Sequence, residues 1–119
     1  MFVAKVTGSV VSTEKVESMR GQKLLVVEPF RIEPTDRETL ITTGRTFIAV
    51  DMLGAGVGDM VLIVQGSSAR FTPETNKLPI DCVVIGIVDS VNIEKKSVYN
   101  RQASDAEAQL REAQLREAQ

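Results

Sequence analysis

Residues 50–65 read VDMLGAGVGDMVLIVQ and decide the fold, because a glycine-rich turn lies there between two apolar stretches. Gly54, Gly56 and Gly58 resemble a phosphate-binding loop only in composition. Such a loop runs from a strand into a helix whose N-terminus faces the phosphate, whereas the apolar residues 60–64 predict a second strand. We therefore interpret the three glycines as parts of a tight inter-strand loop that uses glycine's freedom at positive φ.

Further strands are predicted on both sides of this loop. Residues 2–7 alternate between apolar and polar, as in a half-buried strand. Residues 23–27 carry a continuous apolar run that Pro29 ends, which is typical of a buried strand. Gly86, inside another strand, suggests the close approach of a second backbone. The remaining predicted strands and connections are as follows: strands at 46–51, 59–65 and 81–93, and polar connections at 12–22 and 33–45.

Five or more short strands joined by glycine-rich turns favour an all-β fold, a small OB-like β-barrel, since an open sheet of this size would expose its edges. One polar island follows the strongest strand: Gly66, Ser67, Ser68, Ala69 and Arg70. We expect this island to form a short helical turn at the end of the barrel. Either serine could cap that turn by accepting a backbone N–H bond.

The composition changes abruptly at residue 100. Every Val, Ile, Thr, Gly and Pro lies before residue 101, and the rest of the chain is Ala, Glu, Gln, Leu and Arg with few other residues. This predicts a β-barrel domain at 1–100 and a helical or partly disordered tail at 101–119. Ser104 and Glu107 fit a capping box that starts the tail helix. A helix of about 15 residues is marginal alone, so a dynamic helix, a docked helix and an appended segment all stay open.

Charge and residue types exclude several classes of function. The 14 basic and 16 acidic side chains give a net charge of -2, which argues against nucleic acid as the main partner. The absence of histidine removes the usual general base and a common zinc ligand. We expect no catalytic residue and no cofactor. The lone thiol, Cys82, begins an apolar strand and is predicted to be buried and inert.

The sequence predicts neither a metal site nor a membrane-spanning segment. Four acidic residues, Asp51, Asp59, Asp81 and Asp89, stand mostly where strands begin or end. They are too scattered to predict a metal site, and solvation of strand ends explains them. No apolar run approaches the roughly 20 residues needed to cross a bilayer, and the N-terminus lacks a secretion signal. We therefore expect a cytoplasmic protein that is not a membrane span.

Five stretches together resemble one known family. They occur in the order 4–13, 21–27, 50–62, 66–70 and 79–89, and they cover most of residues 1–94. In this order they are similar to the EutN/CcmL family of bacterial microcompartment vertex proteins. The stretch from Gly66 to Arg70 is similar to the most distinctive short motif of that family, and residues 50–62 to its glycine loop and the following strand.

The resemblance implies a structural subunit that forms a homopentamer and caps the vertices of a microcompartment shell in the bacterial cytoplasm. It also implies hexameric shell proteins as partners, and an assembly or pore loop made of Gly66, Ser67, Ser68, Ala69 and Arg70. Cargo binding through the tail stays open. The residues themselves leave an alternative: an OB-like binding module for an oligonucleotide, a small anion or a protein, with Arg70 and Lys95–Lys96 as anchors.

Overall fold

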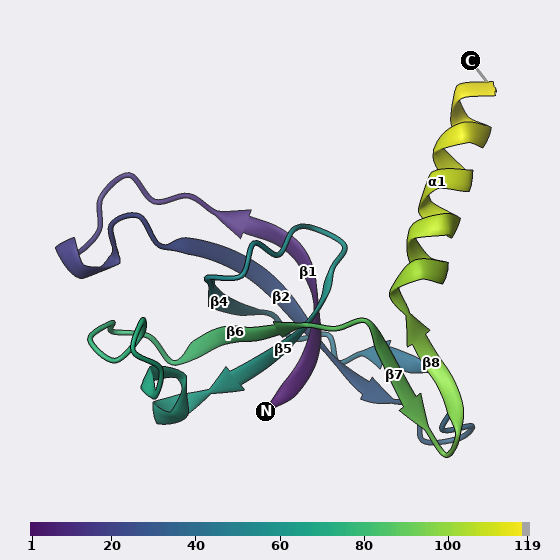
Figure 1. The fold of residues 1–119 in the computed structure, drawn as a ribbon, viewed down its shortest axis with the longest axis horizontal. Coiled ribbons are helices and arrows are strands. Elements are labelled where there is room, and N and C mark those ends of the chain that lie inside the picture. Colours follow the sequence, from purple (N-terminus) through teal and green to yellow (C-terminus); the bar gives the residue numbers. More distant parts are fainter. Residues whose placement is uncertain (118–119) are drawn as a thin grey trace.

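Residues 1–117 are described by a computed structural model (Figure 1). The elements, in chain order, are β1 (Phe2–Val10), η1 (Glu17–Met19), β2 (Lys23–Ile32), β3 (Leu40–Thr42), β4 (Phe47–Asp51), β5 (Met60–Gln65), η2 (Gly66–Arg70), β6 (Cys82–Ile87), β7 (Ser90–Ile93), β8 (Lys96–Asn100) and α1 (Arg101–Glu117). The two η elements are single 3-10 turns. Among these described residues, no helix is both long enough and apolar enough to cross a bilayer.

Five strands close into a barrel. They pair in the order β1-β5-β6-β4-β2, and β2 pairs back with β1 to complete the circle. All of these pairs are antiparallel except β4 with β6, which run parallel. Closure leaves no free edge within the barrel. The predicted all-β fold, a small OB-like barrel with a short helical turn and a C-terminal helix, is confirmed.

The barrel interior is filled by small and branched apolar side chains. Alternate residues of each strand point inward, because successive side chains of a strand lie on opposite faces. An aromatic contact closes one end, where the ring centroids of Phe2 and Phe47 lie 5.5 Å apart. The buried core residues are Ala4, Val6, Leu25, Val27, Ala49, Ala55, Val61, Ile63, Cys82 and Val84.

Several predicted strand limits were wrong. β2 does not end at Pro29 but continues to Ile32. Pro29 lies where β2 stops pairing with β4 and begins to pair with β3, so its missing N–H falls between two partners. The predicted strand 81–93 is two strands, β6 and β7. The polar connection 33–45 contains the edge strand β3, which is only three residues long.

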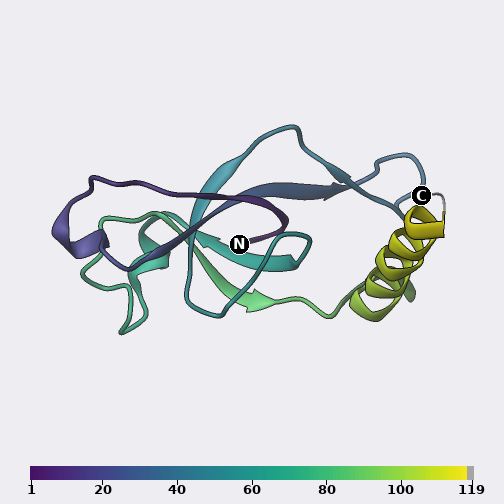
Figure 2. The ribbon, with the colours of Figure 1, turned by 90° about the horizontal axis from the view of Figure 1, so that it is seen from above.

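The chain beyond β6 stands apart from the barrel. β7 and β8 form their own two-stranded sheet, and α1 follows β8 directly (Figures 1 and 2). The radius of gyration is 16.3 Å, against about 13.5 Å for a compact domain of this length. We call residues 90–117 the C-terminal extension. Its length and its position away from the barrel account for this excess.

The predicted start of the tail helix was also wrong. α1 begins at Arg101, three residues before Ser104. The side chain of Asn100, the last residue of β8, accepts a hydrogen bond from the backbone N–H of Ala103 at 3.2 Å. Since Asn100 already satisfies one of the free amides of the first turn, the Ser104–Glu107 pair is not needed as a cap.

Candidate assembly surface

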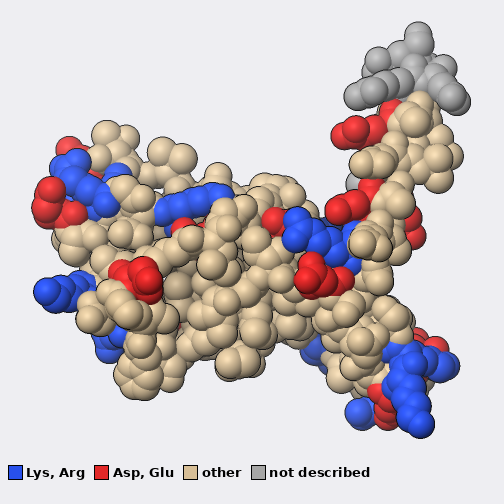
Figure 3. All heavy atoms as spheres, viewed as in Figure 1, with Lys and Arg blue, Asp and Glu red and all other residues tan. Residues whose placement is uncertain are grey.

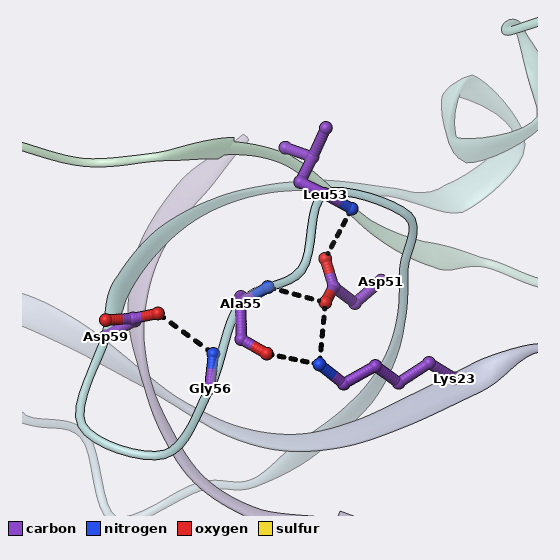
Figure 4. Close-up of polar contacts among 6 residues, drawn as sticks. All are labelled: Lys23, Asp51, Leu53, Ala55, Gly56 and Asp59. Atoms are coloured by element: carbon purple, nitrogen blue, oxygen red, sulfur yellow. Dashed lines mark hydrogen bonds and ion pairs between the residues drawn. The ribbon is translucent and has the colours of Figure 1, made fainter.

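The loop between β4 and β5, residues 52–58, contains the three glycines and is shaped by a buried carboxylate (Figure 4). Asp51 accepts hydrogen bonds from the backbone amides of Leu53 at 2.9 Å and Ala55 at 2.8 Å. The ammonium of Lys23, on β2, lies 3.4 Å from the same carboxylate and donates to the carbonyl of Ala55. We call residues 52–58 the glycine loop. A single acidic side chain therefore sets the path of its first half.

A second carboxylate holds the other half of the glycine loop. Asp59 accepts from the amide of Gly56 at 2.9 Å, and the amide of Gly58 donates to the carbonyl of Val6 on β1 at 2.8 Å. Gly54 and Gly58 have φ values of +86° and +95°, a region that side-chain-bearing residues avoid. The structure thus places the glycines in an inter-strand loop followed by a strand, and a phosphate-binding arrangement is ruled out at this loop.

The polar island forms the 3-10 turn η2, directly after β5. Its first residue, Gly66, has φ +76° and donates its amide to the carbonyl of Asp81 at 2.7 Å. Ala69 is fully buried, whereas Ser67, Ser68 and Arg70 are exposed. The expected serine cap is wrong, because the turn begins from Gln65 without a side-chain hydrogen bond.

The outer surface of one side of the barrel is apolar, which is unusual for a surface strand that faces water. On β2, β4, β5 and β6 the residues that alternate with the core are apolar as well. We call this set the outer apolar face; it consists of Leu24, Val26, Ile48, Val50, Leu62, Val64, Val83 and Ile85. By contrast, β1 presents Lys5, Thr7 and Ser9 to the outside.

Only part of the outer apolar face is covered within the chain. Val50 and Val83 are buried beneath Ala69 of η2, and Met19 of η1 packs on the same cluster. Ile48 remains 48% exposed and Ile85 39% exposed. In the view of Figure 3 the surface over β5 and β6 is mainly free of charged side chains, which lie around it. The uncovered half is therefore a candidate contact surface.

A groove adjoins this exposed half. It has a volume of about 270 Å³ and carries only one charged side chain, that of Glu74. Its walls come from the glycine loop, from β6 and from the turn after η2. The lining residues are Met52, Leu53, Thr72, Glu74, Thr75, Val83, Val84 and Ile85. The glycine loop and the outer apolar face therefore form one continuous surface.

Gly86, in the interior of β6, does not lie in close contact with another backbone. A Cβ atom added at Gly86 would lie 3.6 Å from the Cβ of Leu62, an ordinary van der Waals distance. Gly86 pairs with Leu62 across β5 and β6, next to a register shift at Ile85. The expected close approach within the chain was wrong, and any side chain at this position would project from the outer apolar face.

The other candidate groups do not form a chemical site. Cys82 is only 4% exposed, and burial raises the pKa of its thiol to about 11, so its predicted burial is confirmed. Within residues 1–117, no three acidic or thiol side chains gather at a spacing that could hold a metal ion. Arg70 lies in η2, whereas Lys95 in the β7–β8 turn and Lys96 at the start of β8 lie at the opposite end of the molecule (Figures 1 and 2). They cannot anchor one small ligand together.

The outer apolar face is the feature that sequence reasoning missed. The signal was present in the continuous apolar runs of residues 24–27, 60–64 and 82–85. A strand of a barrel with one wet face should alternate, whereas a continuous run indicates that both faces are covered. The inner face of these strands is buried in the barrel core, and about half of their outer face stays exposed to solvent.

Known proteins are similar to this chain in sequence. The model of a family described as "Ethanolamine utilisation protein EutN/carboxysome" matches residues 1–89. The carboxysome shell vertex protein CcmL of Synechococcus elongatus is 42% identical over 86% of this chain and 97% of its own. The shell vertex protein GrpN of Rhodospirillum rubrum is 46% identical over 76% of this chain and 96% of its own.

Solved structures agree with these similarities. The structure of CcmL from Gloeobacter violaceus superposes with a TM-score of 0.75 at 34% identity, covering 86% of this chain and 99% of that one. A structure described as the GrpN pentameric microcompartment shell protein from Rhodospirillum rubrum has a TM-score of 0.64 at 44% identity. It covers 78% of this chain and 98% of its own.

Proposed function

This chain belongs to the EutN/CcmL family, and from that membership we propose that it is a non-catalytic subunit of a pentamer that caps the vertices of a bacterial microcompartment shell. Relatives at 42% and 46% identity are named shell vertex proteins, and one similar structure is described as pentameric. The similarity extends over nearly the whole length of each relative. The alternative of an OB-like binding module has no comparable support.

The outer apolar face is the single observation on this chain that carries the proposal. Burying an Ile side chain fully is worth about 1.5–3 kcal/mol relative to leaving it exposed. Ile48 and Ile85 are 48% and 39% exposed in the single chain, so a neighbouring subunit that covered them would gain somewhat less than half of that amount for each. The continuous groove beside the glycine loop would add area toward the roughly 1,000 Å² that a stable contact needs.

A ring uses such a surface in a defined way. In a cyclic pentamer each contact is heterologous, so one face of a subunit meets a different face of the next, and the fivefold rotation closes the ring. The barrel fits this because its apolar side over β4 and β6 differs from its polar side over β1. The subunit therefore has two chemically distinct sides.

The place in a shell follows from geometry. Hexagonal tiles alone cover a plane, and a closed polyhedral shell needs pentagons at its corners. Hexameric shell proteins are accordingly the proposed neighbours of the ring, and the shell inside the bacterial cytoplasm is its proposed location. We assign the glycine loop and η2, including Arg70, to the assembly surface, because both adjoin the outer apolar face.

Native mass spectrometry tests the ring directly. Five times the 13.0 kDa chain gives a particle of about 65 kDa, and a protein that stays monomeric at micromolar concentration contradicts the proposal. Ile48→Glu places a charge in the outer apolar face and should shift the population to monomers. Leu110→Glu is the matched control, because Leu110 is 60% exposed on α1, away from that face. An intact ring in the Ile48→Glu variant would show that the outer apolar face is not the contact between subunits.

A further inference from the structure

The C-terminal extension begins where the match to the family model ends. The family match ends at residue 89, one residue before β7. The similar structure described as pentameric is covered over 98% of its own length by only 78% of this chain. The relative described as pentameric therefore lacks a counterpart for about a fifth of this chain, whereas the CcmL structure, which covers 86% of the chain, has a counterpart for part of the extension.

Arg101, at the junction of β8 and α1, links the extension to the barrel by two contacts. Its backbone N–H donates to the carbonyl of Asp89 at 2.8 Å, at the point where the chain leaves β6. Its guanidinium lies 3.6 Å from Oδ1 of Asp59, at the end of the glycine loop. Both side chains are partly buried, at 38% and 24% exposure, so this ion pair is less screened by solvent than a fully exposed one.

Asp59 is shared between the extension and the glycine loop. One carboxylate oxygen faces Arg101, and the other accepts the amide of Gly56. A single side chain thus joins the base of α1 to the loop that borders the outer apolar face. The two segments are 42 residues apart in sequence and have one common anchor.

The β7–β8 turn makes a second set of contacts. Glu94, in the β7–β8 turn, pairs with Arg37 at 3.3 Å, and Lys96 pairs with Glu38. Both partners lie in the loop between β2 and β3. All four of these side chains are more than half exposed, so the two pairs restrain the tip of the β7–β8 hairpin only weakly, and the contact at its base is the less screened one.

From these contacts we propose that the C-terminal extension is a rigid arm, and that Arg101 is the positioning residue that fixes its direction against the glycine loop through Asp59. α1 is consequently displayed away from the barrel at one angle and does not act as a loose tether (Figure 1). A further consequence rests on the proposed ring. Its fivefold symmetry gives all five copies of α1 the same orientation relative to the axis.

Hydrogen exchange measured by mass spectrometry on the full chain tests the arm. Arg101→Ala should raise the exchange rate of residues 90–105 and of the glycine loop together, each by about threefold, the size expected for losing a partly exposed ion pair. Asp59→Asn keeps an acceptor for Gly56 but loses the charge, so it should affect the extension more than the loop. Gln102→Ala, the neighbouring change in the same helical turn, is the control.

The outcomes separate the two proposals. Arg101→Lys should restore part of the protection, and the Arg101→Ala, Asp59→Asn double variant should exchange no faster in the extension than the single Arg101 variant. If the extension of the Arg101→Ala variant exchanged at the wild-type rate, the rigid-arm proposal would be contradicted. The same holds if the effects of Arg101→Ala and Asp59→Asn were additive in the double variant. The mass of the particle is measured in parallel, so a missing ring contradicts the vertex function and leaves the exchange comparison valid on the single chain.

Discussion

Lys23 and Asp51 form an ion pair of 3.4 Å in which the carboxylate is fully buried and the ammonium is half exposed. The pair joins β2 to the end of β4, at the point where the glycine loop begins. Asp51 also accepts two backbone amides of that loop. The shape of the candidate assembly surface therefore depends on the carboxylate of Asp51, which is buried at one end of the barrel.

Replacing that charge should destabilise the protein strongly. Asp51→Ala leaves the amides of Leu53 and Ala55 without their acceptor and the ammonium of Lys23 without its partner. We expect a loss of about 3 kcal/mol in the free energy of unfolding, measured with urea. Asp81→Ala, at an exposed position, should change it by less than about 0.5 kcal/mol. Equal effects at both positions would contradict the role of Asp51.

The glycine loop allows a matched test of backbone strain. Gly54 has φ +86°, whereas Gly56 lies outside the left-handed region, and an added Cβ meets no atom within 4 Å at either position. Gly54→Ala should therefore cost about 1–2 kcal/mol, and Gly56→Ala close to nothing. Thermal unfolding of the two variants measures the difference. A melting temperature that falls equally in both would show that φ is not the cause.

A side chain at Gly86 should affect assembly more than folding. Within the chain its Cβ would make only an ordinary contact with Leu62. Gly86→Val projects from the outer apolar face, so we expect a near-native melting temperature of the monomer and a weaker ring. Size-exclusion chromatography with light scattering, over a dilution series, measures this. A ring as stable as the wild type would place the subunit contact elsewhere.

Removing the tail should leave the ring intact. Residues 101–119 follow the last strand, and the first turns of α1 lie beside the glycine loop and Lys5 without forming part of the barrel. The truncated chain 1–100 is expected to keep its barrel and its particle mass, which native mass spectrometry shows. Dissociation of the truncated protein would mean that α1 holds the subunits together.

The thiol of Cys82 predicts a dependence of stability on alkaline pH. Burial raises its pKa from 9.0 to about 11 in the folded chain. The folded state therefore favours the protonated thiol, and this contribution is complete below pH 9 and is lost as the pH rises toward 11. Cys82→Ala should flatten the fall in unfolding free energy over that range. An identical pH profile in both proteins would contradict the buried, protonated thiol.

Sequence patterns located most of the barrel because they depend on neighbours in the chain. The alternation of residues 2–7, the apolar runs and the glycine turn each identified a strand or a loop that the structure contains. Pro29 misled the prediction, because its tolerance depends on which strand lies beside it. Ser104 misled it as well, because Asn100 of β8 had already capped the helix.

The chain order of apolar, glycine and polar residues was enough to determine an all-β barrel, a buried thiol and membership of a shell-vertex family. Which apolar residues face outward was decided only by the tertiary structure, since a strand that is apolar on both faces carries no period to read. The same holds for the burial of Asp51 and the contact between Arg101 and Asp59. Those contacts join residues far apart in sequence: Lys23 and Asp51 meet because β2 pairs with β4, and Arg101 reaches Asp59 from the start of α1.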